Sequence, residues 1–140
     1  MSVELVRQEE EFGCGIACLA MVLETTYQDV RRDFHTNFNR KAMKPRWYET
    51  YLYDNGCTVV KKRLQVGHMI RSDRMNNSML TPFAPVHIVS ICQVAEWNIS
   101  HAVVMDEEGT LYDPAGNTHE CTRNSVYAVP MVLGIWRDYK

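Results

Sequence analysis

The chain has 140 residues, of which 46% are apolar and 23% are charged, and its formal net charge is −2. A chain of this length can bury one substantial hydrophobic core, so we expect a single domain over residues 1–140. The nearly balanced charge argues against bulk nucleic acid or an anionic membrane surface as a partner.

The first half of the chain is predicted to be helical. Residues 14–24 are apolar on nearly every side, which is typical of a helix buried in a core. Residues 28–38 place apolar side chains four positions apart, which is typical of an amphipathic surface helix. A third helix is expected from Pro45 to about Asn55, because proline suits a first helical turn and Gly56 suits the position after the last one.

The second half is predicted to be a sheet, because β-branched residues dominate it from residue 85 onward. The expected strands are 57–64, 86–94, 100–108, 110–116 and one or two more within 125–136. Residues 65–80 are polar and leave room for one more helix, and Pro130 argues for an edge strand or a bend. Helices followed by an antiparallel-leaning sheet indicate an α+β fold class.

The five cysteines are an odd number, and no two of them have C-x-x-C spacing. Neither a disulfide framework nor a zinc ribbon is therefore expected, and we predict no metal and no other cofactor. The acidic N-terminal segment lacks the apolar core of a signal peptide, and no apolar run approaches the roughly 18 residues of a membrane span. These features predict a cytoplasmic location and no membrane span.

Cys14 stands between two glycines where the first helix is expected to begin, in the stretch QEEEFGCGIACLAMV. Unpaired N–H groups and the helix dipole stabilise a thiolate at such a position. A thiolate there could attack an acyl carbon while the Cys14 N–H helps to hold the oxyanion. The competing interpretation is a small buried hydrophobe, the commoner role of a cysteine in such a domain.

A nucleophilic cysteine needs a base, and His101 opens an apolar strand directly after a turn, a firm position within reach of a cleft. Asp113 closes the next short strand, so a hairpin around residues 107–109 would bring its carboxylate beside His101 and fix the imidazole. The dipeptide Asp113-Pro114 is also a common turn signal. The other histidines are expected on a polar helix face, in polar loops or on a strand: His35, His68, His119 and His87.

Gln8 lies six residues before Cys14. Its side-chain amide could act as the second donor of an oxyanion hole, although a glutamine in an acidic run is also an ordinary surface residue. Taken together, Q-x(5)-C-G-x-A-C-L-A-M, then S-H-A-V-V-M, then Y-D-P-A-G resemble the papain-like peptidase family of bacteriocin maturation. Those peptidases form the N-terminal part of peptide-exporting ATP-binding-cassette transporters and cut leader peptides after a double glycine.

The resemblance runs from about residue 7 to about residue 135 and implies a papain-like fold, with N-terminal helices packed on a C-terminal antiparallel sheet. It implies a cysteine peptidase that acts on a peptide or protein substrate. The implied site is Cys14 as nucleophile, His101 as general base, Asp113 as the residue that orients the histidine, and Gln8 in the oxyanion hole.

This sequence departs from the family in two ways. Gly13 stands where the family usually has Asp, which removes a charge beside the nucleophile. The sequence also has no transmembrane segment and no G-x-x-x-x-G-K-[ST] loop, so we expect no transporter domain in this chain and a free-standing peptidase.

Three alternatives stay open. The first is a non-catalytic module that keeps the cleft and binds a peptide without cutting it. The second is another cysteine-dependent acyl transfer, by a deamidase, a transglutaminase-like or a deubiquitinase-like enzyme, because a triad sets the nucleophile and not the acyl donor. The third is a metal or redox protein built on Cys14-x3-Cys18 and His119-x-Cys121, spacings that match no common metal site.

Overall fold

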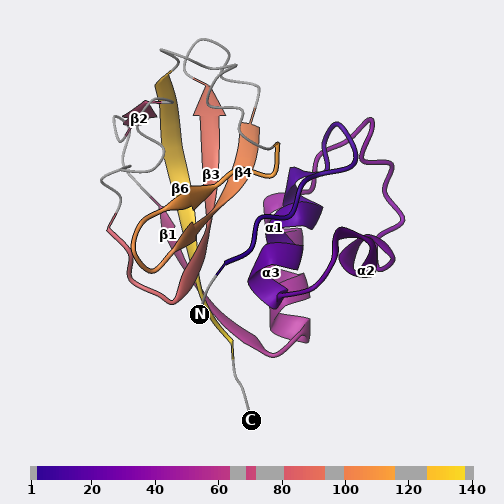
Figure 1. Ribbon diagram of the computed structural model, residues 1–140, viewed down its shortest axis with the longest axis horizontal. Helices are drawn as coiled ribbons and strands as arrows, with labels where there is room; N and C mark the ends of the chain where they lie inside the picture. Colours follow the sequence, from indigo (N-terminus) through magenta and orange to yellow (C-terminus); the bar gives the residue numbers. More distant parts are fainter. Residues whose placement is uncertain (1–2, 64–68, 72–80, 94–99, 116–125, 138–140) are drawn as a thin grey trace.

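The computed structural model describes residues 3–63, 69–71, 81–93, 100–115 and 126–137, and helices and strands form two separate groups within them (Figure 1). The helices are α1 (Cys14–Leu23), α2 (Tyr27–Arg31) and α3 (Pro45–Asp54). The strands are β1 (Cys57–Arg63), β2 (Met69–Arg71), β3 (Val86–Gln93), β4 (Ser100–Asp106), β5 (Leu111–Tyr112) and β6 (Val126–Arg137). The predicted mixture of N-terminal helices and a C-terminal antiparallel sheet is confirmed.

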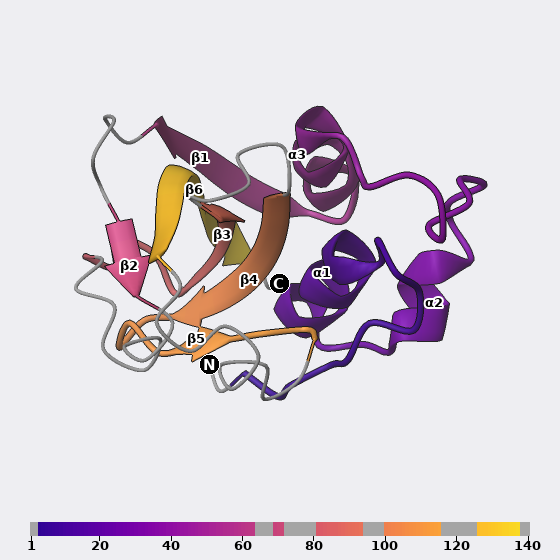
Figure 2. The same ribbon diagram turned by 90° about the horizontal axis from the view of Figure 1, so that it is seen from above.

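The sheet has the strand order β1-β6-β3-β4-β5, with β2 also paired to β6, and each recorded pair is antiparallel. The last strand in the chain therefore lies inside the sheet, where it joins β1 to β3. Strand β6 thus connects β1, from the first half of the sequence, to the strands of the second half. Strand β4 lies on the side of the sheet that faces α1 (Figure 2).

Pro130 lies on β6, which is an inner strand of the sheet. The prediction of an edge strand at this residue is therefore wrong. The other predicted setting, a bend, agrees with the pairing. The register between β3 and β6 shifts between Ser90 and Cys92. On the other side of β6, pairing with β1 ends at Met131 and pairing with β2 begins at Ala128. A residue without an N–H group fits the unpaired step between them.

Helix α1 is buried on nearly every side, as its sequence predicts, and it lies between β4 and α2 (Figure 2). Its residues from Ile16 to Val22 are almost completely inaccessible and form the centre of the core. Glu24 caps the C-terminal end of the helix, and Arg137 at the end of β6 forms an ion pair with that residue at 3.0 Å. Helix α1 is therefore held by packing along its length and by an ion pair at its C-terminal end.

The predicted helix over residues 28–38 is wrong in its length, because α2 ends at Arg31. The Arg31 guanidinium donates hydrogen bonds to the carbonyl groups of Phe34 and Thr36, which stabilise the irregular chain beyond the helix. Phe38 is fully buried in the core, and Phe34 packs against aromatic side chains of α3. Core burial, and not helical periodicity, explains the apolar spacing that suggested a longer helix.

Helix α3 and strand β1 agree closely with the prediction. Pro45 is the first residue of α3, and Gly56 has a φ of +80°, a left-handed conformation that favours glycine just beyond a helix end. The additional helix expected within residues 65–80 is absent from Met69–Arg71, which form β2, and the rest of that range lies outside the described residues. In the described ranges, no helix has the length and apolar character needed to cross a bilayer.

Candidate active site

Cys14 is the first residue of α1, and 8% of its surface is exposed. Gly13, at the N-cap, has no side chain that could cap the helix, so the first turn keeps donors available for another acceptor. Within the described part of the chain, the Cys14 N–H donates to no recorded acceptor, whereas the Gly13 N–H donates to the Glu10 carbonyl at 3.0 Å. The sulfur and one free donor thus share the start of a buried helix.

The β4–β5 hairpin places the predicted histidine and aspartate side by side. Val104 pairs with Tyr112, and the turn between the strands uses Gly109 at a φ of +90°. His101 Nε2 donates to Asp113 Oδ1 at 2.6 Å, and the same oxygen accepts the Ala115 N–H at 2.9 Å. The Asp113 side chain is 8% exposed and that of His101 is 25% exposed, so the pair is largely shielded from water.

Cys14 and His101 hydrogen-bond to each other, and this contact changes the acidity of both groups. Burial alone raises the pKa of the Cys14 thiol, but the hydrogen bond and positive charge of His101 and the N–H groups of Ala102 and Gly15 outweigh it. The net pKa of Cys14 therefore lies below its ordinary value. Burial lowers the pKa of His101, while Asp113 and Cys14 together raise it to about 10. A thiolate beside an imidazolium is the favoured charge state.

Gln8 lies beside the same site, because its backbone N–H donates to the Pro114 carbonyl at 2.8 Å, one residue after Asp113. Its side-chain Nε2 donates to the carbonyl groups of Glu10 at 3.0 Å and Glu11 at 2.9 Å. The Gln8 Oε1 atom is buried without a hydrogen-bond partner among the described residues. Both amide hydrogens are thus directed at the turn before Cys14, and the role of Gln8 as an oxyanion donor stays a prediction.

The sequence interpretation missed a cluster of three side chains near Gly13, formed by Glu10, Tyr27 and Arg31. The Tyr27 hydroxyl donates to Glu10 Oε1 at 2.6 Å, and Arg31 Nε donates to the same oxygen at 2.8 Å. A Cβ atom added to Gly13 would lie 2.2 Å from the Tyr27 hydroxyl oxygen. Gly13 has an ordinary φ of −87°, so lack of space explains this glycine and backbone conformation does not. A glycine directly before a candidate nucleophile was the only sequence signal for this cluster.

Cys18, His87 and His35, the other candidates among the described residues, are not part of this arrangement. Cys18 is fully buried one helical turn beyond Cys14, and burial raises the pKa of its thiol well above the ordinary value. His87 is fully buried, and its Nε2 accepts the N–H groups of Phe83 at 3.0 Å and Ala84 at 3.1 Å. His35 is exposed, while His68 and His119 lie outside the described residues.

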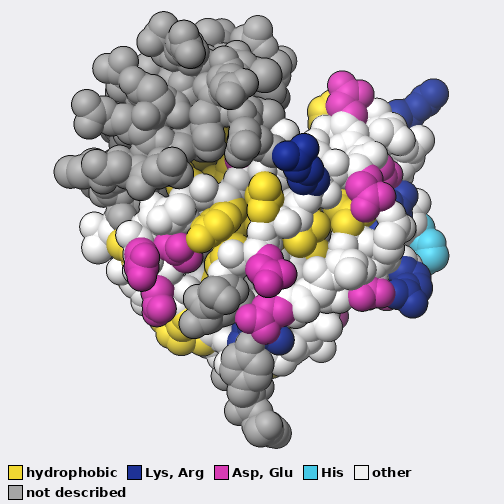
Figure 3. Space-filling model, in the orientation of Figure 1, with side chains coloured by type: hydrophobic (Ala, Val, Ile, Leu, Met, Phe, Trp, Pro, Cys, Tyr) yellow, Lys and Arg dark blue, Asp and Glu magenta, His cyan; other side chains and the backbone are white. Residues whose placement is uncertain are grey.

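The metal-ligating and charged side chains can be described for part of the chain only. No group of three metal-ligating side chains occurs in the described ranges, and Cys121, part of the metal alternative, lies outside them. Figure 3 shows acidic and basic side chains interspersed with apolar ones on the face it presents. That face carries no broad basic area among its described residues.

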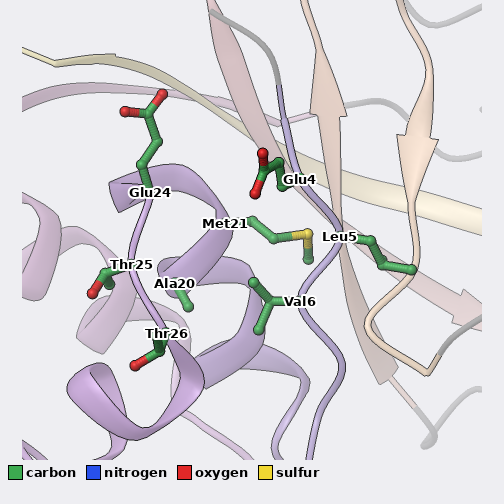
Figure 4. A pocket seen from close by; sticks show the side chains of 8 residues that line it. All are labelled: Glu4, Leu5, Val6, Ala20, Met21, Glu24, Thr25 and Thr26. Atoms are coloured by element: carbon green, nitrogen blue, oxygen red, sulfur yellow. The ribbon is translucent and has the colours of Figure 1, made fainter.

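A cavity of about 470 Å³ lies at the opposite end of α1 from Cys14. The N-terminal segment and the connection from α1 to α2 surround it (Figure 4). Its lining residues are Glu4, Leu5, Val6, Ala20, Met21, Glu24, Thr25 and Thr26. None of these residues belongs to the Cys14–His101–Asp113 arrangement, so the cavity is separate from the candidate active site.

No protein-family model and no curated protein matches the sequence. The structure is similar to the crystal structure of a double glycine motif protease from an AMS/PCAT transporter in complex with the leader peptide. The TM-score is 0.56 at 18% sequence identity, and the match covers 98% of this chain and 93% of that chain. A likeness at this identity shows that the two chains share a fold.

Proposed function

We propose that the protein is a cysteine peptidase with a papain-like fold that cleaves a peptide or protein substrate through Cys14, His101 and Asp113. The observation that carries the proposal is the continuous contact from the Cys14 sulfur through the imidazole to the buried Asp113 carboxylate. A catalytic centre is expected to hold three titratable groups in successive contact, in which the pKa of the nucleophile is lowered and the pKa of the base is raised.

In the proposed mechanism, the Cys14 thiolate attacks the scissile carbonyl carbon and forms a tetrahedral intermediate. The free Cys14 N–H donates to the oxyanion, and Gln8 becomes the second donor once it releases one carbonyl of the turn. The His101 imidazolium then gives its proton to the leaving amine, which leaves an acyl-enzyme. Neutral His101 activates a water molecule that hydrolyses the thioester and restores the starting pair.

Asp113 has two tasks in this scheme. Its hydrogen bond to His101 Nε2 leaves Nδ1 as the imidazole nitrogen that faces Cys14. Its negative charge stabilises the imidazolium that must exist before the leaving amine is protonated. The hydrogen bond from the Ala115 N–H to the same carboxylate oxygen keeps that oxygen in place.

The substrate that we propose is a peptide with a leader segment. The support is the shared fold, because the similar structure is a double glycine motif protease bound to a leader peptide. We also propose a reducing, cytoplasmic environment, since Cys14 and Cys18 are free thiols and oxidation of Cys14 would remove the nucleophile.

The test is thiol labelling followed by mass spectrometry of a peptide library. At about pH 6, where ordinary thiols are protonated, iodoacetamide should label Cys14 much faster than the other cysteines, and Cys14→Ala should lose this fast phase. Incubation with peptides should then yield cleaved products that require Cys14. A mass increase of about one unit without cleavage would instead indicate deamidation, and the absence of a fast-labelling thiol would refute an activated pair.

A further inference from the structure

We propose that Glu10 is a positioning residue for the oxyanion hole of this site. With Tyr27 and Arg31, its carboxylate holds residues 8–13, here called the entry turn, so that the Cys14 N–H stays free for the substrate oxyanion. The inference rests on the proposed peptidase function. It concerns the binding of the oxyanion and not the activation of the thiol.

The Glu10 carboxylate is fixed by two donors on one oxygen. Tyr27, from the start of α2, donates at 2.6 Å, and Arg31, from its end, donates at 2.8 Å. Arg31 is itself anchored by hydrogen bonds to the carbonyl groups of Phe34 and Thr36. The Glu10 side chain is only 15% exposed, so water competes weakly for these charge-assisted bonds.

The same cluster is in contact with the residue before the nucleophile. The Tyr27 hydroxyl oxygen occupies the space that a Gly13 side chain would need, at 2.2 Å from a built Cβ. A polar group that fills this space while bonded to Glu10 sets the distance between the entry turn and α2. Gly13 is therefore part of the device that positions Cys14, although it has no side chain to contribute.

The backbone of the entry turn explains how Glu10 could reach the oxyanion. The Glu10 carbonyl accepts both the Gly13 N–H at 3.0 Å and the Gln8 side-chain Nε2 at 3.0 Å. Displacement of Glu10 would therefore move both candidate oxyanion donors, the Gln8 amide and the backbone that leads into Cys14. Glu10 therefore links α2 to the active site: its carboxylate binds side chains of α2, and its carbonyl binds the donors beside Cys14.

Three successive N–H groups at the end of the entry turn have acceptors. The Glu11 N–H donates to the Asn39 side chain at 3.2 Å, and the Phe12 N–H donates to the Phe38 carbonyl at 2.6 Å. With the Gly13 N–H on Glu10, three successive peptide N–H groups have acceptors, and the next one, on Cys14, has none among the described residues. A turn held in this way leaves one donor at the sulfur, as an oxyanion hole requires.

The experiment compares two reactions of the same thiolate. Iodoacetamide alkylation forms an S–C bond and expels iodide without an oxyanion, whereas acylation by p-nitrophenyl acetate passes through a tetrahedral oxyanion and expels p-nitrophenolate. For Glu10→Gln, the alkylation rate should stay within about twofold of wild type, and the acylation rate should fall about 10-fold to 100-fold, less than or comparable to the loss of a full oxyanion donor. Tyr27→Phe should change the ratio of the two rates in the same direction by a smaller factor.

Glu9→Gln is the matched control, because Glu9 is an exposed neighbouring carboxylate that, among the described residues, accepts from the exposed Gln28 amide at 2.6 Å and from no member of the Glu10 cluster. Both of its rates should equal those of wild type. If Glu10→Gln and Tyr27→Phe lower both rates equally, or lower neither, while wild-type Cys14 alkylates rapidly, the inference is wrong and the proposed function survives. Slow alkylation of wild-type Cys14 would overturn both. Should Glu10→Gln fail to fold by circular dichroism, Tyr27→Phe alone decides the outcome.

Discussion

The two sides of the candidate active site are built in different ways. On the sheet side, His101 lies on β4, Asp113 directly follows β5 of the same hairpin, and a hydrogen bond joins their side chains. On the helix side, Cys14 follows a turn that is held by side chains of α2 and by residues 38 and 39. A short stretch of sequence suffices for the first side, while the second needs contacts between distant segments.

This difference predicts different responses to mutation. Changes on the sheet side should alter charge states, because the His101–Asp113 contact determines which proton is where. Changes on the helix side should alter the position of Cys14 and the free energy of unfolding. The entry turn is neither helix nor strand, and contacts with distant segments hold it in place. The predictions below test that division, beginning with the nucleophile on which both sides converge.

Cys14→Ala should have the largest effect, a loss of peptidase activity of at least about 10³-fold, since the acyl-enzyme can no longer form. Its partner in the comparison is Cys18→Ala, one turn further along α1 and fully buried. That change should leave activity nearly intact and lower the free energy of unfolding by about 1 kcal/mol. Initial rates of peptide cleavage and urea unfolding measure the two effects. Equal losses of activity in both variants would contradict the assignment of the nucleophile.

Asp113→Asn should come next, with an effect that depends on pH. The carboxylate helps to raise the pKa of His101 to about 10, so its removal lowers that pKa and destabilises the thiolate–imidazolium pair. Iodoacetamide labelling of Cys14 near neutral pH should slow by about 10-fold or more, because each pKa unit is a tenfold change. Labelling rates measured from about pH 5 to about pH 10 should show a plateau in wild type and a steep rise in the variant. If the labelling rate of the variant keeps the plateau, Asp113 does not contribute to the activation of the Cys14 thiol.

The same pair predicts how stability changes with pH. The pKa of His101 is raised above its ordinary value of 6.5 to about 10 in the folded protein. The stabilisation that follows is fully present below pH 6.5 and is lost as the pH rises through about 10. Thermal unfolding of wild type and Asp113→Asn should therefore differ most below pH 6.5 and converge at the alkaline end. A difference that grows with rising pH would have the wrong sign for this coupling.

The sequence predicted the sheet side better than the helix side, and the reason is physical. Alternation and turn residues such as Gly109 determine a hairpin locally, so the position of Asp113 beside His101 follows from about a dozen residues. The entry turn depends on Tyr27 and Arg31, whose contacts with Glu10 arise only when α2 packs on α1. The inner position of β6 depends in the same way on long-range pairing, which no local pattern contains.

Gly13→Ala should lower activity less than Cys14→Ala or Asp113→Asn does, and it tests the helix side alone. A Cβ at this position meets the Tyr27 hydroxyl at 2.2 Å, so the tyrosine or the entry turn must move, at a cost of about 1–3 kcal/mol in unfolding free energy. The matched control is Gly56→Ala, where nothing lies within 4 Å but φ is +80°. That variant should lose about 1 kcal/mol through backbone strain alone.

The two glycine variants can be separated by a second substitution. Tyr27→Phe removes the hydroxyl that blocks Gly13, so the double variant Gly13→Ala/Tyr27→Phe should be more stable than the sum of the single losses predicts. Tyr27→Phe should add independently to Gly56→Ala, because the two sites share no partner. Double-mutant cycles measured by urea unfolding give both coupling energies. If the losses of unfolding free energy at Gly13 and Tyr27 are additive, the added Cβ is accommodated by movement of other residues of the entry turn. The helix side would then be less rigid than these contacts indicate.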